Sequence, residues 1–312
     1  MTLASIPPLI RSGRFALAIV WVAAFATPAA AAQRIISTDA FVTELLFSLD
    51  AQDQLIAIDV TSKLPDTYAR DLPNVGYHRN LSAEGLLSLE PTLVIGSQHM
   101  GPPPVIKALS SANIQLLQLP VAHSPSALKD NIRKTAKAVG MPRQGEAVST
   151  RLNQQLSILK DIELAHERIA FLLAMAPGKL RLAGDDTSGQ AFIELLGATN
   201  VASFENYRNV SEESLMTLNP SMIIIAGSAS DDDPANPTIA WNLLNYSEAV
   251  KHDKVFHIDG GSLVAGLSLS SVQEALRIAH AAGNRPSTTV STARAGLKTS
   301  GTQRDSDLDR QQ

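Results

Sequence analysis

The chain has 312 residues, 45% of them hydrophobic and 18% charged, which is enough for a packed core and for two ordinary domains, although a single domain stays open. A formal net charge of −4 argues against a nucleic-acid-binding protein. There is no cysteine, which excludes both a disulfide framework and a lipid-modified N-terminal cysteine.

Residues 1–32 differ from the rest of the chain. Arg11 and Arg14 precede the apolar run FALAIVWVAAFA, which is followed by the small residues of TPAAAA. This order is typical of a secretory signal peptide cleaved near Ala32, and about a dozen apolar residues are short for a membrane span. Cleavage would lower the formal charge to about −6, because the segment carries two arginines and no acid. We expect a soluble protein exported to the periplasm.

Short apolar runs then alternate with segments of helical period, which indicates α/β units around a mainly parallel sheet. Two stretches show this alternation and predict two α/β lobes, an N-terminal lobe at 33–142 and a C-terminal lobe at 168–284. The final segment, 285–312, is rich in Ser, Thr, Gly and charged residues and is expected to be a disordered tail.

Residues 143–167 separate the two lobes. No Pro or Gly follows Gly145 there, and apolar residues recur every three or four positions, at Val148, Leu152, Leu156, Leu159 and Ile162. That spacing predicts one long amphipathic helix of roughly 30 Å, a stiff connector between the lobes.

One stretch of the chain occurs twice. GYHRNLSAEGLLSLEPTLVI, at 76–95, returns as NYRNVSEESLMTLNPSMIII at 206–225, so that Ser82 aligns with Ser211 and Glu84 with Glu213. In each copy the Ser is expected to cap a helix with an acid in its first turn. Two related lobes explain the shared scaffold, but they explain less well why the Glu recurs.

Tyr77 lies in the loop before the first of these helices, beside Gly76 and close to Arg79. Ferric iron favours a hard phenolate oxygen, and tyrosine is a known axial ligand of haem. A guanidinium nearby favours the ionised phenol or pairs with a carboxylate. The loop therefore suits an anionic or metal-bearing ligand.

The run VGYHRNLSAEGLLSLEPTLVI, with GPP at 101–103, resembles the periplasmic haem-binding proteins of bacterial ABC importers. These belong to the wider class of siderophore and cobalamin binding proteins (class III), which have two Rossmann-like lobes joined by one long helix. The resemblance implies an α/β fold with a ligand cleft between the lobes. It extends from about Arg34 to Gly283.

The resemblance implies roles for single residues. Tyr77 would be the axial ligand of ferric haem b, and Arg79 would bond Tyr77 or a haem propionate. Glu84 and Glu213, one on each lobe, would dock onto the dimeric permease of the importer, which works with a cytoplasmic ATPase. The alternative for each Glu is a solvated acid that interacts favourably with the helix dipole.

Some members carry a His just after the first strand of the second lobe, where this chain has Met175. A thioether is a poor ligand for ferric iron opposite phenolate, so an apolar wall is the preferred interpretation of Met175. Tyr207 and Arg208 are left open between cleft-facing and surface positions. His78 and His99 are candidates for propionate or second-shell contacts, with weaker claims for His123 and His257.

The seven histidines form no zinc-binding pair at helical spacing. The run DDDP at 231–234 lacks the spacing of a calcium loop, and neither G-x-G-x-x-G nor G-x-S-x-G occurs. These absences give no support to an enzyme. The resemblance implies a periplasmic protein, which we expect to be monomeric, that captures haem and delivers it to an ABC importer. A ferric-siderophore or corrinoid binding protein is the alternative within the class, and an exported metal-dependent hydrolase is the alternative outside it.

Overall fold

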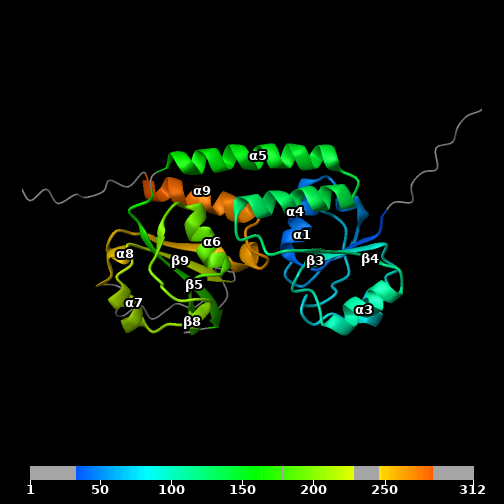
Figure 1. The fold of residues 1–312 in the computed structure, drawn as a ribbon, viewed down its shortest axis with the longest axis horizontal. Coiled ribbons are helices and arrows are strands. Elements are labelled where there is room, and N and C mark those ends of the chain that lie inside the picture. Colours follow the sequence, from blue (N-terminus) through cyan, green and yellow to red (C-terminus); the bar gives the residue numbers. More distant parts are fainter. Residues whose placement is uncertain (1–32, 163, 177–178, 228–245, 284–312) are drawn as a thin grey trace, which may run out of the picture.

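The computed structural model describes residues 33–162, 164–176, 179–227 and 246–283. They form two α/β lobes that lie side by side beneath one long helix (Figure 1). The fold expected from the sequence, two Rossmann-like lobes joined by a long helix, is confirmed. The predicted signal peptide (1–32) and tail (285–312) lie outside the described residues. Within the described part of the chain, no helix is long and apolar enough to cross a membrane.

The N-terminal lobe is built on a four-stranded parallel sheet in the order β2-β1-β3-β4. Every residue of the central strand β3 is buried, as expected for a parallel strand that is covered on both faces. The strands are β1 (Ile35–Ser37), β2 (Leu55–Ala57), β3 (Leu93–Ser97) and β4 (Gln115–Leu119). The helices are α1 (Ala40–Ser48), α2 (Ala83–Leu87), α3 (Pro103–Ser111) and α4 (Pro125–Ala138), with a 3-10 turn η1 (Gln52–Gln54).

The C-terminal lobe has a mixed sheet in the order β10-β9-β5-β6-β8, with β7 beside β5. Its strands are β5 (Arg168–Ala176), β6 (Lys179–Ala183), β7 (Thr199–Asn200), β8 (Tyr207–Asn209), β9 (Met222–Gly227) and β10 (Val255–Asp259). The prediction of a mainly parallel sheet holds for β10, β9, β5 and β7. It misses β6 and β8, which run antiparallel to their neighbours. The helices are α6 (Ser188–Leu195), α7 (Glu212–Leu218), α8 (Glu248–Lys251) and α9 (Leu269–Gly283), with a 3-10 turn η3 (Gly260–Leu263).

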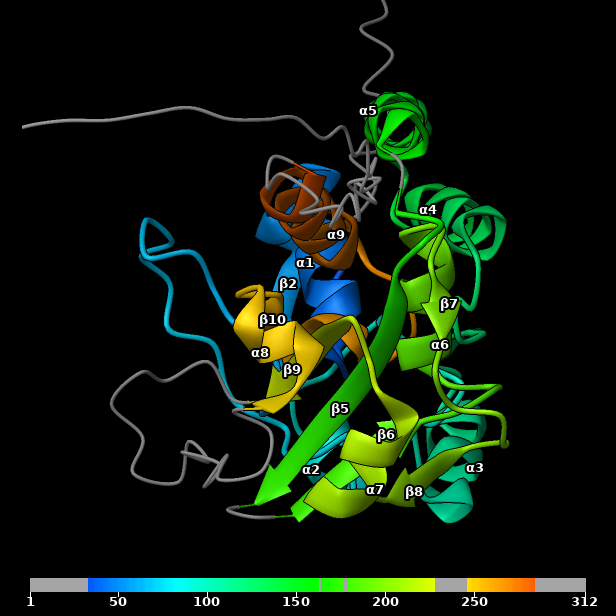
Figure 2. The same ribbon diagram turned by 90° about the vertical axis from the view of Figure 1, so that its left-hand side faces the viewer.

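The two faces of the C-terminal sheet have different surroundings. Ile169, Phe171 and Leu173 of β5 pack into a hydrophobic cluster that continues through α6 and α9 into the N-terminal lobe. We call this face the inner face. The outer face carries Ala170 and Leu172, which pack with residues of α7 and α8. Accordingly, α7 and α8 lie at the end of the molecule away from the N-terminal lobe (Figure 1), and Figure 2 shows β9, β5, β6 and β8 in succession across the sheet.

The long helix α5 spans Pro142–Asp161 and lies across both lobes (Figure 1). It begins one residue before the predicted start, with proline in the first turn, where its missing N–H costs nothing. The predicted end at 167 is wrong by six residues. The backbone of Ile162 is extended, and Leu164 and Glu167 then bury their side chains in the C-terminal lobe. The sequence of 162–167 contains no Pro or Gly to signal that end.

A second connection joins the lobes below α5, and we call it the interlobe seam. Ala122, just after β4, donates its N–H to the carbonyl of Ala265 (3.1 Å) and accepts from the N–H of Leu267 (2.7 Å). Lys63 Nζ lies 2.5 Å from Asp259 Oδ2. Because Lys63 and Ala122 follow β2 and β4, the carboxyl edge of the N-terminal sheet is turned toward the C-terminal lobe.

Candidate functional site

Tyr77 is placed at the carboxyl edge of the N-terminal sheet by an extension of β2. Beyond Ala57, the chain at 58–60 pairs with 73–76: Ile58 donates to the carbonyl of Pro73 (3.0 Å), and Val60 donates to that of Gly76 (3.1 Å). Gly76 has φ of +87°, a conformation that favours glycine. The turn at Gly76 ends the pairing, so that Tyr77 emerges at the edge that faces the other lobe.

The segment after Tyr77 is tied to the loop that contains Gly101. Gly101 donates its N–H to the carbonyl of His78 (2.9 Å), and its own carbonyl accepts from the N–H of Leu81 (3.0 Å). The N–H of Asn80 closes a turn onto the carbonyl of Tyr77 (2.8 Å). These backbone bonds hold Tyr77 in a defined loop rather than on a free tip.

The phenol of Tyr77 is accessible, with 46% of the residue exposed, whereas its neighbour His78 is 1% exposed. The two rings lie 4.2 Å apart between centroids, at an interplanar angle of 50°. Burial lowers the pKa of His78, and the nearby carboxylate of Asp59 offsets part of that effect. Its Nδ1 is buried without a hydrogen-bond partner. His78 therefore forms a wall behind Tyr77 rather than a contact reaching outward.

Arg79 is exposed on the same loop, and its charge acts on two of the other candidates. Burial is the largest cause that lowers the pKa of His99, and the charge of Arg79 is the next. Arg79 also lowers the pKa of His78, where burial is again the largest cause. The structure thus brings Tyr77, His78, Arg79 and His99 together on one edge of the N-terminal lobe. Arg79 supplies the positive charge beside the accessible phenol, because lowered pKa values keep His78 and His99 neutral at neutral pH.

The repeated glutamates take equivalent positions on the two lobes. Ser82 Oγ accepts from the N–H of Gly85 (3.2 Å) to cap α2, and Ser211 Oγ accepts from the N–H of Ser214 (3.3 Å) to cap α7. Both predicted caps are confirmed. Glu84 and Glu213 each lie exposed in the first turn that follows. Two hydrogen bonds to the Glu213 carboxylate lower its pKa: the larger effect comes from the backbone N–H of Glu213 itself and the smaller from the side chain of Ser211.

The candidates on the C-terminal lobe are separated by the pleat of the sheet. Tyr207 pairs with Ala183 and therefore lies on the inner face, where its hydroxyl accepts from the N–H of Gly189 (3.2 Å). Arg208 points to the outer face, with its guanidinium 4.5 Å from the ring centroid of Phe204. Met175 belongs to β5, but its side chain lies outside the described part.

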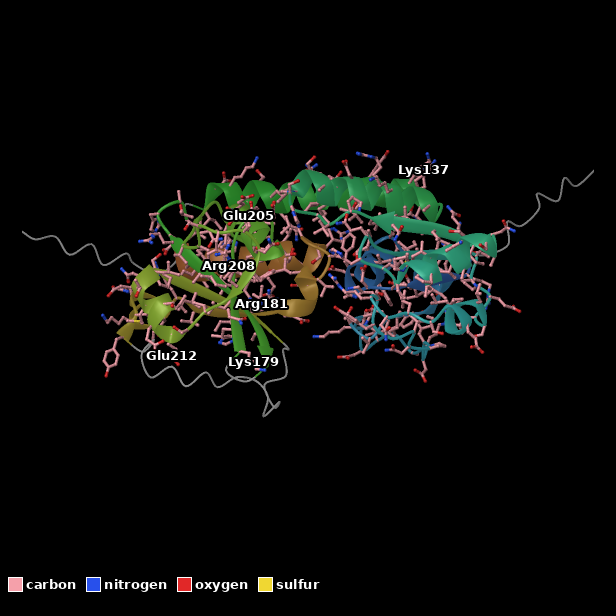
Figure 3. All side chains as sticks on the ribbon, turned by 60° about the horizontal axis from the view of Figure 1, so that its bottom comes forward. Lys137, Lys179, Arg181, Glu205, Arg208 and Glu212 are labelled. Atoms are coloured by element: carbon pink, nitrogen blue, oxygen red, sulfur yellow. The ribbon has the colours of Figure 1, made fainter. Side chains whose placement is uncertain are left out.

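Sequence reasoning missed one residue of the inner face, Arg181. It pairs with Leu173 on one side and with Asn209 on the other, and Lys179 precedes it by two positions along β6 (Figure 3). The signal was present in the sequence, because KLRLA alternates charged and apolar residues directly after the dipeptide Pro177-Gly178, which marks a turn.

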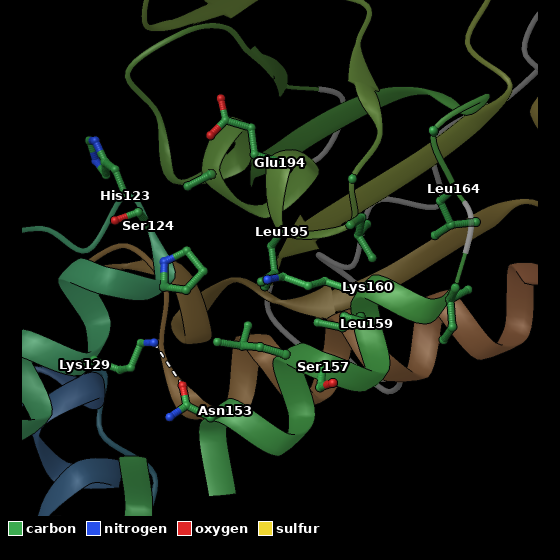
Figure 4. A pocket seen from close by; sticks show the side chains of 17 residues that line it. His123, Ser124, Lys129, Asn153, Ser157, Leu159, Lys160, Leu164, Glu194 and Leu195 are labelled. Atoms are coloured by element: carbon green, nitrogen blue, oxygen red, sulfur yellow. Dashed lines mark hydrogen bonds between the residues drawn. The ribbon is translucent and has the colours of Figure 1, made fainter. Parts of the chain in front are cut away.

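The other predicted positions are less informative. Among the described residues, no group of three or more His, Asp or Glu side chains could hold a metal ion. The acidic run 231–234 lies outside the described residues. His123 lines a cavity of about 690 Å³ between α4, α5 and α6, together with Lys129 and Lys160 (Figure 4). That cavity lies beneath the long helix and does not include Tyr77.

Comparison with known proteins places this geometry in a family. A periplasmic haem-binding protein, HutB of Vibrio cholerae, is 35% identical with a TM-score of 0.72, over 80% of this chain and 98% of that one. A periplasmic haem-binding protein from Pseudomonas aeruginosa is 30% identical with a TM-score of 0.71, over 80% and 92%. A vitamin B12-binding protein of Yersinia pestis is 24% identical over 228 residues, 72% of this chain and 80% of that one. The model of the family described as periplasmic binding protein matches residues 35–260, so the chain belongs to the periplasmic binding protein family.

Proposed function

We propose that this protein captures ferric haem between its two lobes and delivers it to the permease of an ABC importer for haem and iron uptake. The observation that carries the proposal is Tyr77, an accessible phenol held in a bonded loop on the edge that faces the C-terminal lobe. Two of the structures most similar to this chain are those of proteins named as haem-binding. Haem is the cargo in this proposal, and no catalytic turnover is involved.

The residues around Tyr77 suit an anionic, iron-bearing ligand. A phenolate oxygen is a hard donor for ferric iron. Arg79 favours the ionised phenol or pairs with a propionate, and His99 is half-buried nearby as a second polar contact. The half-buried apolar side chain of Leu173 on the inner face offers a surface for the porphyrin.

Delivery requires a partner that recognises both lobes. Glu84 and Glu213, exposed at the first turns of α2 and α7, give each lobe one acid at an equivalent position. Two such acids match a permease dimer with two-fold symmetry. In this proposal the protein acts as a monomer in the periplasm, after removal of residues 1–32 as a signal peptide, and a cytoplasmic ATPase drives the importer.

The first test is a titration of the mature protein, residues 33–312, with ferric haem while the visible spectrum is recorded. We expect saturation near one equivalent with the charge-transfer band of a high-spin ferric tyrosinate. Tyr77→Phe should lose this band and bind haem more weakly. Tyr246→Phe is the matched control, because Tyr246 is also exposed, at 71%, but lies before α8.

A corrinoid is the second candidate, because one curated relative is named a vitamin B12-binding protein. A parallel titration with cobalamin separates the two ligands. Binding of cobalamin without binding of haem would overturn the proposal in favour of the corrinoid. Haem binding that Tyr77→Phe leaves unchanged would contradict the role of Tyr77 as the iron ligand.

A further inference from the structure

The inner face of β6 carries two cations, Lys179 and Arg181, which we call the inner cation pair. Arg181 aligns with Leu173 of β5, and alternation along β6 puts Lys179 on the same side. Leu180 and Leu182, which alternate with them, pack against the outer cluster. The pleat therefore directs both cations toward the side of the sheet on which the N-terminal lobe lies.

Arg181 is held in place by its neighbour on β8. One terminal nitrogen of its guanidinium donates to the carbonyl of Tyr207 (2.7 Å), and its central carbon lies 5.7 Å from the Tyr207 ring centroid. Tyr207 is itself held by the hydrogen bond from Gly189 to its hydroxyl. A guanidinium has five N–H donors, so donors beyond the one to Tyr207 can take a ligand with little further loss of side-chain freedom.

The positive charges of the inner cation pair are free to bind a ligand. Arg181 is half-buried and Lys179 is exposed, and neither takes part in an ion pair with the acids of the described residues. The planar fork of an arginine matches a carboxylate in a bidentate arrangement, and the bond is charge-assisted. This chemistry suits an oxyanion as the ligand of Arg181, and the propionates are the oxyanions that haem carries.

We propose that Arg181, assisted by Lys179, binds a propionate carboxylate of the haem whose iron is held by Tyr77. This inference rests on the proposed function. The N-terminal lobe then holds the iron and the C-terminal lobe holds a carboxylate of the same ligand. Arg181 is thereby a specificity residue, since a neutral or esterified porphyrin offers it no carboxylate for a charge-assisted, bidentate bond.

The test compares ferric haem with its dimethyl ester, in which both propionates are neutral, on the wild type and on Arg181→Ala. We expect Arg181→Ala to weaken haem binding about tenfold to a hundredfold. The band of the Tyr77 complex should remain, because the iron ligand is untouched. Esterification should weaken binding to the wild type strongly and to Arg181→Ala much less. Arg181→Lys should recover part of the affinity for haem but not for the ester.

The matched control is Arg208→Ala, one position beyond Tyr207 on β8 but directed to the outer face. It removes the same charge from the neighbouring strand and should leave the affinity for haem unchanged. The far-ultraviolet circular dichroism and thermal unfolding of each variant establish that it is folded.

The outcomes distinguish the inference from the proposed function. If the wild type binds no haem, both the proposed function and this inference are overturned. If the wild type binds haem through Tyr77 but Arg181→Ala binds equally well, or keeps the full penalty for esterification, only the inference is overturned.

Discussion

Glu44 on α1 accepts a hydrogen bond at 3.3 Å from the hydroxyl of Ser270 in the first turn of α9, across the interlobe seam. Burial raises the pKa of Glu44 from 4.5 to about 7, although hydrogen bonds from Ser270 and Ser268 partly oppose the shift. Lys63, Asp259 and Glu274 line a small cavity together with Glu44, and Arg151 of α5 lines a second one with Glu44. The seam therefore contains a carboxyl group that titrates near neutral pH.

This raised pKa predicts a pH dependence of stability. A carboxyl group whose pKa is higher in the folded state contributes its stability below pH 4.5, and that contribution is lost as the pH rises through about 7. The loss amounts to about 3 kcal/mol at 1.36 kcal/mol for each pKa unit. We expect the free energy of unfolding, from urea titrations, to fall between pH 5 and pH 8 more steeply in the wild type than in Glu44→Gln. Burial also raises the pKa of Asp39, to about 6, and this group adds the same pH dependence to both proteins. Equal slopes would contradict the prediction.

Gly266 should tolerate no side chain. Its φ is +88°, and a Cβ built there would lie 2.5 Å from the carbonyl oxygen of Ala122 on the other lobe. We expect Gly266→Ala to destabilise the protein by about 2 kcal/mol or more, because backbone strain and displacement of the seam add together. Gly140→Ala is the control, since Gly140 has φ of +74° with open space around its Cβ position. Urea unfolding of both variants separates the two effects, and equal losses would argue that the contact with Ala122 is unimportant.

A buried ion pair holds the start of β5. Glu167 is 1% exposed, with Lys254 Nζ at 2.5 Å from Oε1 and the hydroxyl of Ser221 donating to Oε2 at 2.6 Å. Burial alone would raise the pKa of Glu167, but these two partners, with a smaller effect from His166, bring it below the ordinary value. Lys254→Met should therefore destabilise the fold by about 3 kcal/mol or more, since it leaves the buried carboxylate without its lysine and with only the exposed His166 to pair with it.

Two further variants test that explanation. In the double variant Glu167→Gln, Lys254→Met the loss should be smaller, because no charge is left buried. Lys251→Met removes a cation from an exposed pair with Glu248 and should cost less than about 1 kcal/mol. Thermal unfolding that shows the single and double variants at Lys254 to be equally unstable would contradict the role of the buried charge.

The sequence predicted much of this fold because its signals are local. The apolar periodicity of 143–162 and the caps at Ser82 and Ser211 each depend on neighbours within a few residues, and the structure contains the helices they predict. The alternation of strands and helices indicates a parallel sheet, and loops such as the one with Tyr77 then lie at its carboxyl edge.

The repeated stretch shows where local signals fail. Tyr77, Arg79 and Asn80 lie in a loop, whereas Tyr207, Arg208 and Asn209 form the strand β8, although the letters nearly match. The first copy has His78 inserted between Tyr and Arg, and its ring is buried. The second copy lies beside β6, whose paired residues are 24 to 28 positions away in the chain. Whether a partner strand is available is a long-range property, so sequence alone could not decide which face Arg208 would take.

Charge reversal at the repeated glutamates tests the proposed docking. Glu84→Lys and Glu213→Lys should bind haem as the wild type does, because both residues lie exposed on the first turns of α2 and α7 and neither is among the residues proposed to bind haem. Each should reduce haem import and stimulation of the ATPase by the loaded protein, measured with the permease complex in proteoliposomes, because a like charge would then face the basic partner. The double variant should lose stimulation almost completely. Glu146→Lys on the exposed side of α5 carries the same charge change and should import normally. Normal import by the double variant would show that these acids serve only the dipoles of their own helices.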